Sequence, residues 1–112
     1  MIQDAKYPIK YIDKVYTIEE LKELLTPLFK QYPVHKAILY GSYARGEATP
    51  TSDVDIVIDT RNQLKGFSWC GVMADAEEVL FKYVDAHEHS RLKSNSVVLK
   101  AMQTEGVMLY ER

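Results

Sequence analysis

Two aspartates stand on the segment that most clearly predicts a strand. In residues 53–59, the apolar side chains Val54, Ile56 and Ile58 alternate with Asp53, Asp55, Val57 and Asp59. Successive strand side chains point to opposite faces, so Asp53 and Asp55 share a face, with their Cα atoms roughly 6.5–7 Å apart. Two negative charges this close repel each other unless a cation compensates them. Mg²⁺ suits these oxygen ligands, because it usually binds one or two carboxylates together with substrate phosphates.

A glycine-rich turn precedes this strand and offers groups that bind phosphate. Residues 37–40 are an apolar run that predicts a buried strand, and Gly41 and Ser42 follow directly. Gly41 can take a positive φ, the Ser42 N–H can donate to phosphate, Gly46 is unhindered, and Arg45 can add a charge-assisted contact. A solvated pair of acids or a Gly-Ser turn is common on its own. Together they indicate a phosphate cradle beside a metal site, the minimum for metal-assisted attack on a phosphoanhydride.

The surrounding pattern predicts an α/β (α+β) fold in which a small mixed sheet packs against helices. Thr17 and Glu20 form a capping box at the start of a helix, which we expect Pro27 to kink or divide and Pro33 to end. We expect a helix over 67–82 with an apolar stripe of Val72, Ala76, Val79 and Leu80, a strand over 83–87, a helix over 95–104 with Gly106 as C-cap, and a last strand over 107–110. Residues 1–10 show no clear periodicity, and periodicity does not fix the strand order.

Length and composition set the class of protein. The 112 residues predict a single domain spanning 1–112. The net charge of −2 argues against nucleic acid as the main ligand. Cys70 is the one cysteine, so no intrachain disulfide can form, which fits a reducing compartment. No apolar run approaches the length of a membrane span, and we therefore expect a cytoplasmic protein with no membrane partner.

The motif carries a family resemblance. Gly41-Ser42, ten residues and then Asp53-x-Asp55, with Ala44-Arg45-Gly46 inside, resembles the signature of the DNA polymerase beta-like nucleotidyltransferases. Within that superfamily the chain most resembles the minimal nucleotidyltransferases, which include the MntA-type antitoxins paired with HEPN-domain toxins. The resemblance implies a third carboxylate on a later strand, and Asp85 matches it. It further implies that Asp53, Asp55 and Asp85 bind Mg²⁺ in a two-metal site, that Asp85 helps to deprotonate the acceptor hydroxyl, and that ATP is the donor.

The resemblance also implies an acceptor. AMP would pass to a tyrosine hydroxyl of a HEPN-type ribonuclease toxin, so that this chain acts as an antitoxin in a hetero-oligomer. Two alternatives are a non-catalytic subunit that masks its partner sterically and an enzyme for a small molecule such as an aminoglycoside. Three clustered acids argue against the first, and a short chain with little room for an acceptor pocket argues against the second. His87 and His89 could share a strand face and bind a metal, although exposed histidines are common.

Overall fold

The computed structural model describes residues 12–112 and places helices on both faces of one four-stranded sheet. In chain order its elements are α1 (Ile18–Lys30), β1 (Lys36–Tyr40), α2 (Ser42–Arg45), β2 (Val54–Asp59), α3 (Phe67–Leu80), β3 (Val84–Glu88), the 3-10 turn η1 (His89–Arg91), α4 (Val97–Glu105) and β4 (Val107–Glu111). Residues 1–10, for which the sequence predicts no element, lie outside the described part of the chain.

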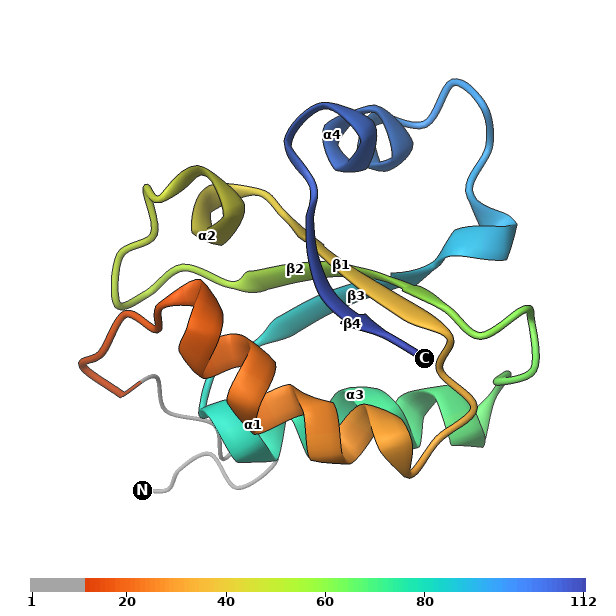
Figure 1. The fold of residues 1–112 in the computed structure, drawn as a ribbon, viewed down its shortest axis with the longest axis horizontal. Helices are drawn as coiled ribbons and strands as arrows, with labels where there is room; N and C mark the ends of the chain where they lie inside the picture. Colours follow the sequence, from red (N-terminus) through yellow and green to blue (C-terminus); the bar gives the residue numbers. More distant parts are fainter. Residues whose placement is uncertain (1–11) are drawn as a thin grey trace, which may run out of the picture.

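The sheet is mixed, as predicted, with the strand order β3-β2-β1-β4 (Figure 1). β1 pairs antiparallel with both β2 and β4, whereas β3 pairs parallel with β2. A parallel pair needs a crossover connection, and α3 supplies it. Tyr40 of β1 is the partner of Asp55 in β2, and Asp55 is in turn the partner of Asp85 in β3. The pairing therefore places three polar side chains in one row across the sheet.

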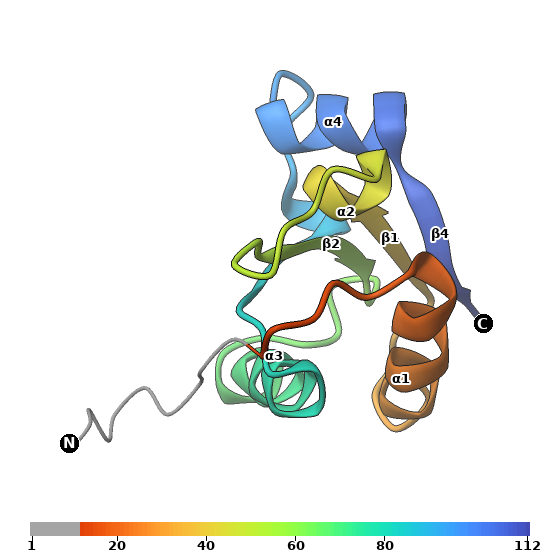
Figure 2. The same cartoon turned by 90° about the vertical axis from the view of Figure 1, so that its left-hand side faces the viewer.

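The two faces of the sheet have different roles. The face toward α1 and α3 is the core, where Val54 and Ile56 form one buried cluster with Leu21, Leu25 and Phe29. Figures 1 and 2 show α1 and α3 together on this side and α4 on the other. Burial of these apolar side chains is the main favourable contribution to folding. The opposite face carries the row that contains Asp55.

The capping box of α1 is confirmed, but Pro27 does not divide the helix. The Thr17 hydroxyl accepts from the Glu20 N–H, and the Glu20 carboxylate accepts from the Thr17 N–H. The helix continues through Pro27 to Lys30 and is capped by Gln31, ahead of Pro33. A proline removes one backbone donor. Burial of Leu28 and Phe29 in the next turn offsets that loss.

α3 confirms three of its four predicted core residues, and Lys82 follows it into the interior. Val72, Ala76 and Leu80 are buried, whereas Val79 lies at the edge of their stripe and is 38% exposed. The Lys82 side chain is fully buried and its Nζ donates to the backbone carbonyls of Ile12 and Pro50. Burial lowers the pKa of Lys82. This amine ties the segment before α1 to the loop that leads into β2.

The C-terminal elements match the predictions with small shifts of their boundaries. α4 begins at Val97, because the Ser96 hydroxyl accepts from the Leu99 N–H and so caps the helix there. Gly106 is the C-cap, as predicted, and β4 begins at the next residue. None of the helices that the structure describes has the length and apolar content that a membrane span requires.

Candidate functional site

Three aspartates gather where β2 and β3 begin. Asp55 and Asp85 are direct neighbours in the parallel pair, and Asp53 precedes the first residue of β2. Asp55 is half-buried, whereas Asp53 and Asp85 are exposed. We refer to Asp53, Asp55 and Asp85 as the aspartate cluster. Tyr40 is buried on β1, the antiparallel neighbour of β2, and it completes the row on the side of Asp55 opposite to Asp85.

The cluster holds more negative charge than its surroundings compensate. Burial, followed by the charges of Asp85 and Asp53, raises the pKa of Asp55 to about 6. His87 and Arg45 act in the opposite direction with smaller effects. Burial, followed by the charges of Asp85 and Asp55, also raises the pKa of the Tyr40 hydroxyl. The site is therefore electrostatically prepared for a cation.

The glycine turn lies against Asp55. Gly41 has φ 79° and ψ −156°, a conformation that belongs almost solely to glycine. A Cβ at this position would collide with Asp55 Oδ2. α2 follows, and Gly46 closes it with a left-handed φ of 74°. The sequence therefore needs glycine at position 41 for two reasons, the backbone conformation and the closeness of the carboxylate.

Two of the predicted phosphate contacts are already engaged by Glu105, at the end of α4. The Gly41 N–H donates to Glu105 Oε2 at 2.7 Å, and Arg45 Nη1 donates to Oε2 at 3.0 Å and to Oε1 at 3.2 Å. Arg45 Nε also donates to Glu47 at 3.0 Å. The Gly41 N–H, followed by Arg45, lowers the pKa of Glu105. Of the remaining predicted members of the turn, Ser42 lies between Gly41 and Arg45, and Gly46 follows Arg45.

The two histidines contact different aspartates. His87 shares the site face of β3 with Asp85, and its Nε2 lies 3.3 Å from Asp85 Oδ1. His89 lies beyond β3 in η1, with Nδ1 4.0 Å from Asp59 Oδ2. Since β3 ends at Glu88, the alternative in which both histidines share a strand face is not what the structure contains.

The donor set suits a metal that brings some of its own ligands. Within residues 12–112, no group of three or more His, Cys, Asp or Glu side chains is arranged to hold a metal ion by itself. Mg²⁺ commonly binds through one or two carboxylates and completes its shell with phosphate oxygens and water. Burial, followed by the charges of Asp85 and Asp53, raises the pKa of Asp55, and a positive charge here would counteract these effects. The cluster thus fits Mg²⁺ that arrives with a nucleotide.

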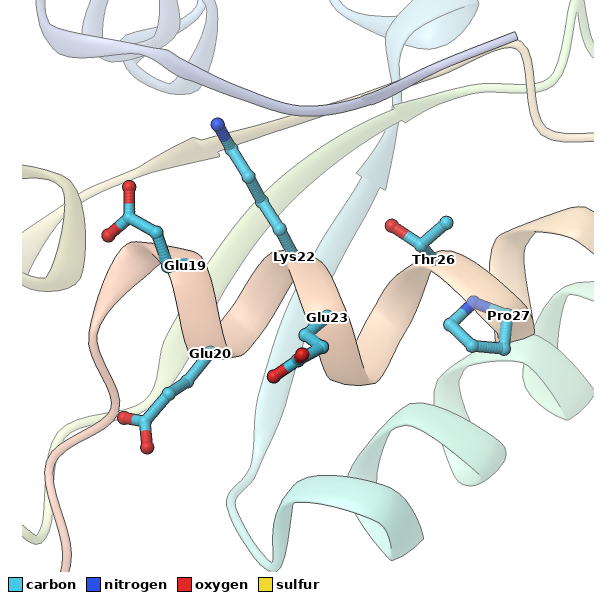
Figure 3. A pocket seen from close by; sticks show the side chains of 6 residues that line it. All are labelled: Glu19, Glu20, Lys22, Glu23, Thr26 and Pro27. Carbon is cyan, nitrogen blue, oxygen red and sulfur yellow. The ribbon is translucent and has the colours of Figure 1, made fainter.

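A concave region lies on α1, away from the aspartate cluster. It is an open hollow along α1 (Figure 3), and its lining residues are Glu19, Glu20, Lys22, Glu23, Thr26 and Pro27. All six come from one helix, and that helix covers the core face of the sheet. The hollow offers no backbone turn and no convergent set of groups from other elements, so we assign it no role.

Sequence reasoning missed Tyr40 and Glu105 as parts of the site, and it considered His87 only as a metal ligand together with His89, not as a neighbour of Asp85. Tyr40 ends an apolar run and reaches the row only through the register of β1 with β2. Glu105 is 64 residues from Gly41, so local spacing could not associate the two. For His87, the parity with Asp85 on the predicted strand was an available signal.

Comparison with known sequences gives consistent matches. The family model described as polymerase beta, nucleotidyltransferase matches residues 22–112. A Methanocaldococcus jannaschii protein that bears the provisional name protein adenylyltransferase is 35% identical over 68 residues, which are 61% of this chain and 73% of that protein. The protein adenylyltransferase MntA of Thermococcus cleftensis is 34% identical over 82 residues, which are 70% of this chain and 83% of the relative.

Solved structures share the fold. A crystal structure of a toxin-antitoxin with AMP-PNP has a TM-score of 0.71 and 19% identity, covering 81% of this chain and 73% of that one. A structure of the tri-AMPylated Shewanella oneidensis HEPN toxin in complex with MNT antitoxin has a TM-score of 0.66 and 16% identity, covering 86% of this chain and 74% of that one. At these identities the likeness establishes a shared fold.

Proposed function

Because the chain belongs to the polymerase beta nucleotidyltransferase family, we propose that it transfers AMP from ATP to a tyrosine hydroxyl of a HEPN-type toxin and so acts as an antitoxin. The observation that carries the proposal is the pairing of Asp55 with Asp85, directly beside the Gly41 turn. This arrangement brings the carboxylates that would bind the metal and the turn that would bind phosphate to one end of β2. The names of the archaeal relatives support adenylyl transfer to protein.

Asp53, Asp55 and Asp85 would hold Mg²⁺ in this reaction. Bound there, the metal would neutralise charge on the triphosphate and on the leaving pyrophosphate. Asp55 is the central ligand, because it is half-buried and lies beside Asp85 in the row. Asp53 and Asp85 are exposed on either side of it, so both can reach ligands that come from solvent.

In this proposal Asp85 receives the proton of the acceptor. β3 is an edge strand of the sheet, and the Asp85 side chain is 58% exposed. An acceptor hydroxyl that approaches from this edge would pass its proton to the Asp85 carboxylate. The oxygen of the acceptor hydroxyl would then bond to the α-phosphorus. The bond from that phosphorus to the bridging oxygen would break, and pyrophosphate would leave with the electron pair.

A protein acceptor agrees with how open the site is. Asp53 and Asp85 both reach the surface, so an acceptor side chain carried by another protein can approach them. One of the similar solved structures is a complex of a tri-AMPylated HEPN toxin with an MNT antitoxin. A tyrosine of a HEPN-type partner is therefore the acceptor we propose.

Intact mass spectrometry of a HEPN-type protein, purified separately from this chain, tests the proposal. The toxin would be incubated with this chain, ATP and Mg²⁺, next to an Asp53→Asn, Asp55→Asn double variant. Asp59→Asn is the matched control, since Asp59 lies on β2 at its other end. We expect mass increments of whole AMP groups with the unchanged chain and the control, and none with the double variant.

The same experiment separates the rivals. A stable complex without any mass increment would favour steric masking by a non-catalytic subunit. Labelling of small hydroxyl compounds by radioactive ATP, with no labelling of the toxin, would favour a small-molecule transferase. Mapping the modified residue by fragmentation would then show whether the acceptor is a tyrosine.

A further inference from the structure

One carboxylate joins the glycine turn of the site to α4, a helix that is distant in sequence. Glu105 ends α4, and its Oε2 accepts from both the Gly41 N–H at 2.7 Å and Arg45 Nη1 at 3.0 Å. The two donors stand at opposite ends of the turn, one before α2 and one at its last residue. Glu105 therefore bridges the turn across its full length.

The position of Glu105 is itself fixed by the sheet. Gly106 follows it, and a Cβ at Gly106 would lie 2.8 Å from Ile38 Cγ2 of β1 and would also collide with the Met102 carbonyl. β4 begins directly after Gly106 and pairs with β1. Since β1 also leads into Gly41, the bridge joins the end of β1 to the start of β4, at one end of this strand pair. The Glu105 carboxylate can therefore move little relative to the turn.

The turn has to stand at a defined distance from Asp55. Gly41 packs so closely on Asp55 that a side chain at position 41 would collide with the carboxylate. A small movement of Gly41 would therefore change its spacing to the aspartate cluster. α2 has only four residues and has little rigidity of its own. The hydrogen bonds to Glu105 connect both ends of the turn to α4.

We infer that Glu105 is a positioning residue for nucleotide binding: its carboxylate holds the Gly41–Arg45 turn at the spacing from the aspartate cluster that a bound triphosphate requires. This inference rests on the proposed nucleotidyl transfer. Glu105 acts through the Gly41 N–H and the Arg45 guanidinium and does not itself contact the nucleotide. Its effect should consequently appear in the affinity for ATP and only weakly in the stability of the fold.

Titration calorimetry with ATP and Mg²⁺ measures the first consequence. Glu105→Ala removes both interactions, and we expect the Kd for ATP to rise about tenfold or more, the usual effect of losing hydrogen bonds to a charged group. Glu105→Gln keeps an oxygen that can accept from Gly41 but loses the ion pair with Arg45, so its Kd should lie between the two. Glu111→Gln is the matched control, because Glu111 pairs with Lys36 at the other end of β1 and should leave the Kd unchanged.

Amide hydrogen exchange followed by NMR supplies an independent readout without nucleotide. We expect the Gly41 N–H to exchange about tenfold faster in Glu105→Ala and to stay largely protected in Glu105→Gln. The thermal midpoint of all three variants should remain close to that of the unchanged protein. A general loss of structure would instead accelerate amides throughout the sheet.

Two results would overturn the inference. One is a Glu105→Ala protein that binds ATP as tightly as the unchanged chain, or more tightly, since the carboxylate would then be dispensable or would compete with phosphate. The other is unchanged exchange of the Gly41 amide in that variant. If the unchanged chain fails to bind ATP, the proposed function fails instead, while the exchange experiment still tests whether Glu105 holds the turn.

Discussion

The strands β2 and β3 carry carboxylates at both ends, and the surroundings of these carboxylates differ between the two ends. Where the strands finish, Glu88 is buried and accepts from the Thr60 N–H, the Thr60 hydroxyl and the Ser90 N–H. Where they begin, Asp55 lies among Asp53 and Asp85, and its pKa rises to about 6. Donors of the chain itself satisfy the Glu88 carboxylate, whereas the aspartates at the other end keep negative charge that their neighbours do not compensate.

The difference separates an acid that supports the fold from acids available for chemistry. Backbone and hydroxyl donors that surround a buried carboxylate make it a structural anchor. Carboxylates that repel one another beside an open surface instead favour a cation from outside. Position on the strand, rather than the type of residue, thus distinguishes the two roles.

The largest expected effect is on catalysis at the beginning of β2. Asp55→Asn removes the central carboxylate of the cluster, and we expect AMP transfer to fall by about 10²-fold or more, because charge stabilisation in the transition state is lost. Transfer rates would be measured with radioactive ATP and the HEPN-type acceptor. Asp59→Asn should keep most of the rate. Equal losses in the two variants would remove the distinction between the two ends.

At the other end, the expected effect is on stability. Glu88→Ala leaves the buried Thr60 N–H without its acceptor, and the free energy of unfolding should fall by about 2–3 kcal/mol. Urea unfolding followed by circular dichroism measures this change. Affinity for ATP should stay within about twofold of the unchanged protein under native conditions. A large loss of affinity without loss of stability would place Glu88 in the site.

The third prediction concerns pH in the absence of metal. The pKa of Asp55 is about 6 in the folded chain against an ordinary value of 3.8, so the folded state retains the proton longer than the unfolded state does. Stability should therefore fall as pH rises from about 4 to 6, by about 1–2 kcal/mol for this partly exposed group. Asp55→Asn should remove that fall and be the more stable protein at pH 7.

Urea unfolding in the presence of EDTA, at half-unit steps of pH, would measure this dependence. Addition of Mg²⁺ and ATP should reverse the order of stability at pH 7, because ligands that bind the folded state stabilise it. An Asp55→Asn variant whose stability has the same pH profile as that of the unchanged chain would show that Asp55 is not the group responsible for the pH dependence.

The smallest effect is expected for the exposed pair at the end of β2. His89 and Asp59 stand 4.0 Å apart, and the His89 side chain is 43% exposed. His89→Asn should change the free energy of unfolding by less than about 0.5 kcal/mol and leave AMP transfer unaltered. Thermal unfolding and the transfer assay would measure the two. A marked loss of transfer would mean that the site extends to this end of the strand.

Local patterns predicted the elements, and long-range pairing determined the site. The capping box of Thr17 and Glu20 and the alternation along β2 depend on neighbours within a few residues, and the structure confirms both. The juxtaposition of Asp55 with Asp85 depends on a parallel register across a crossover helix, which periodicity does not encode; the family resemblance suggested Asp85 instead. Glu105 lay beyond either approach, since neither spacing nor the motif connects it with Gly41.

The burial of Lys82 gives the protein a chemical reporter of its own opening. Lys30 and Lys36 are exposed, so an amine-reactive reagent would acylate them at once, whereas the Lys82 amine is enclosed with the carbonyls of Ile12 and Pro50. Acylation at Lys82 requires those segments to separate. The rate at which mass mapping detects it would follow how often the loop before β2 detaches, and occupancy of the neighbouring site should slow that rate.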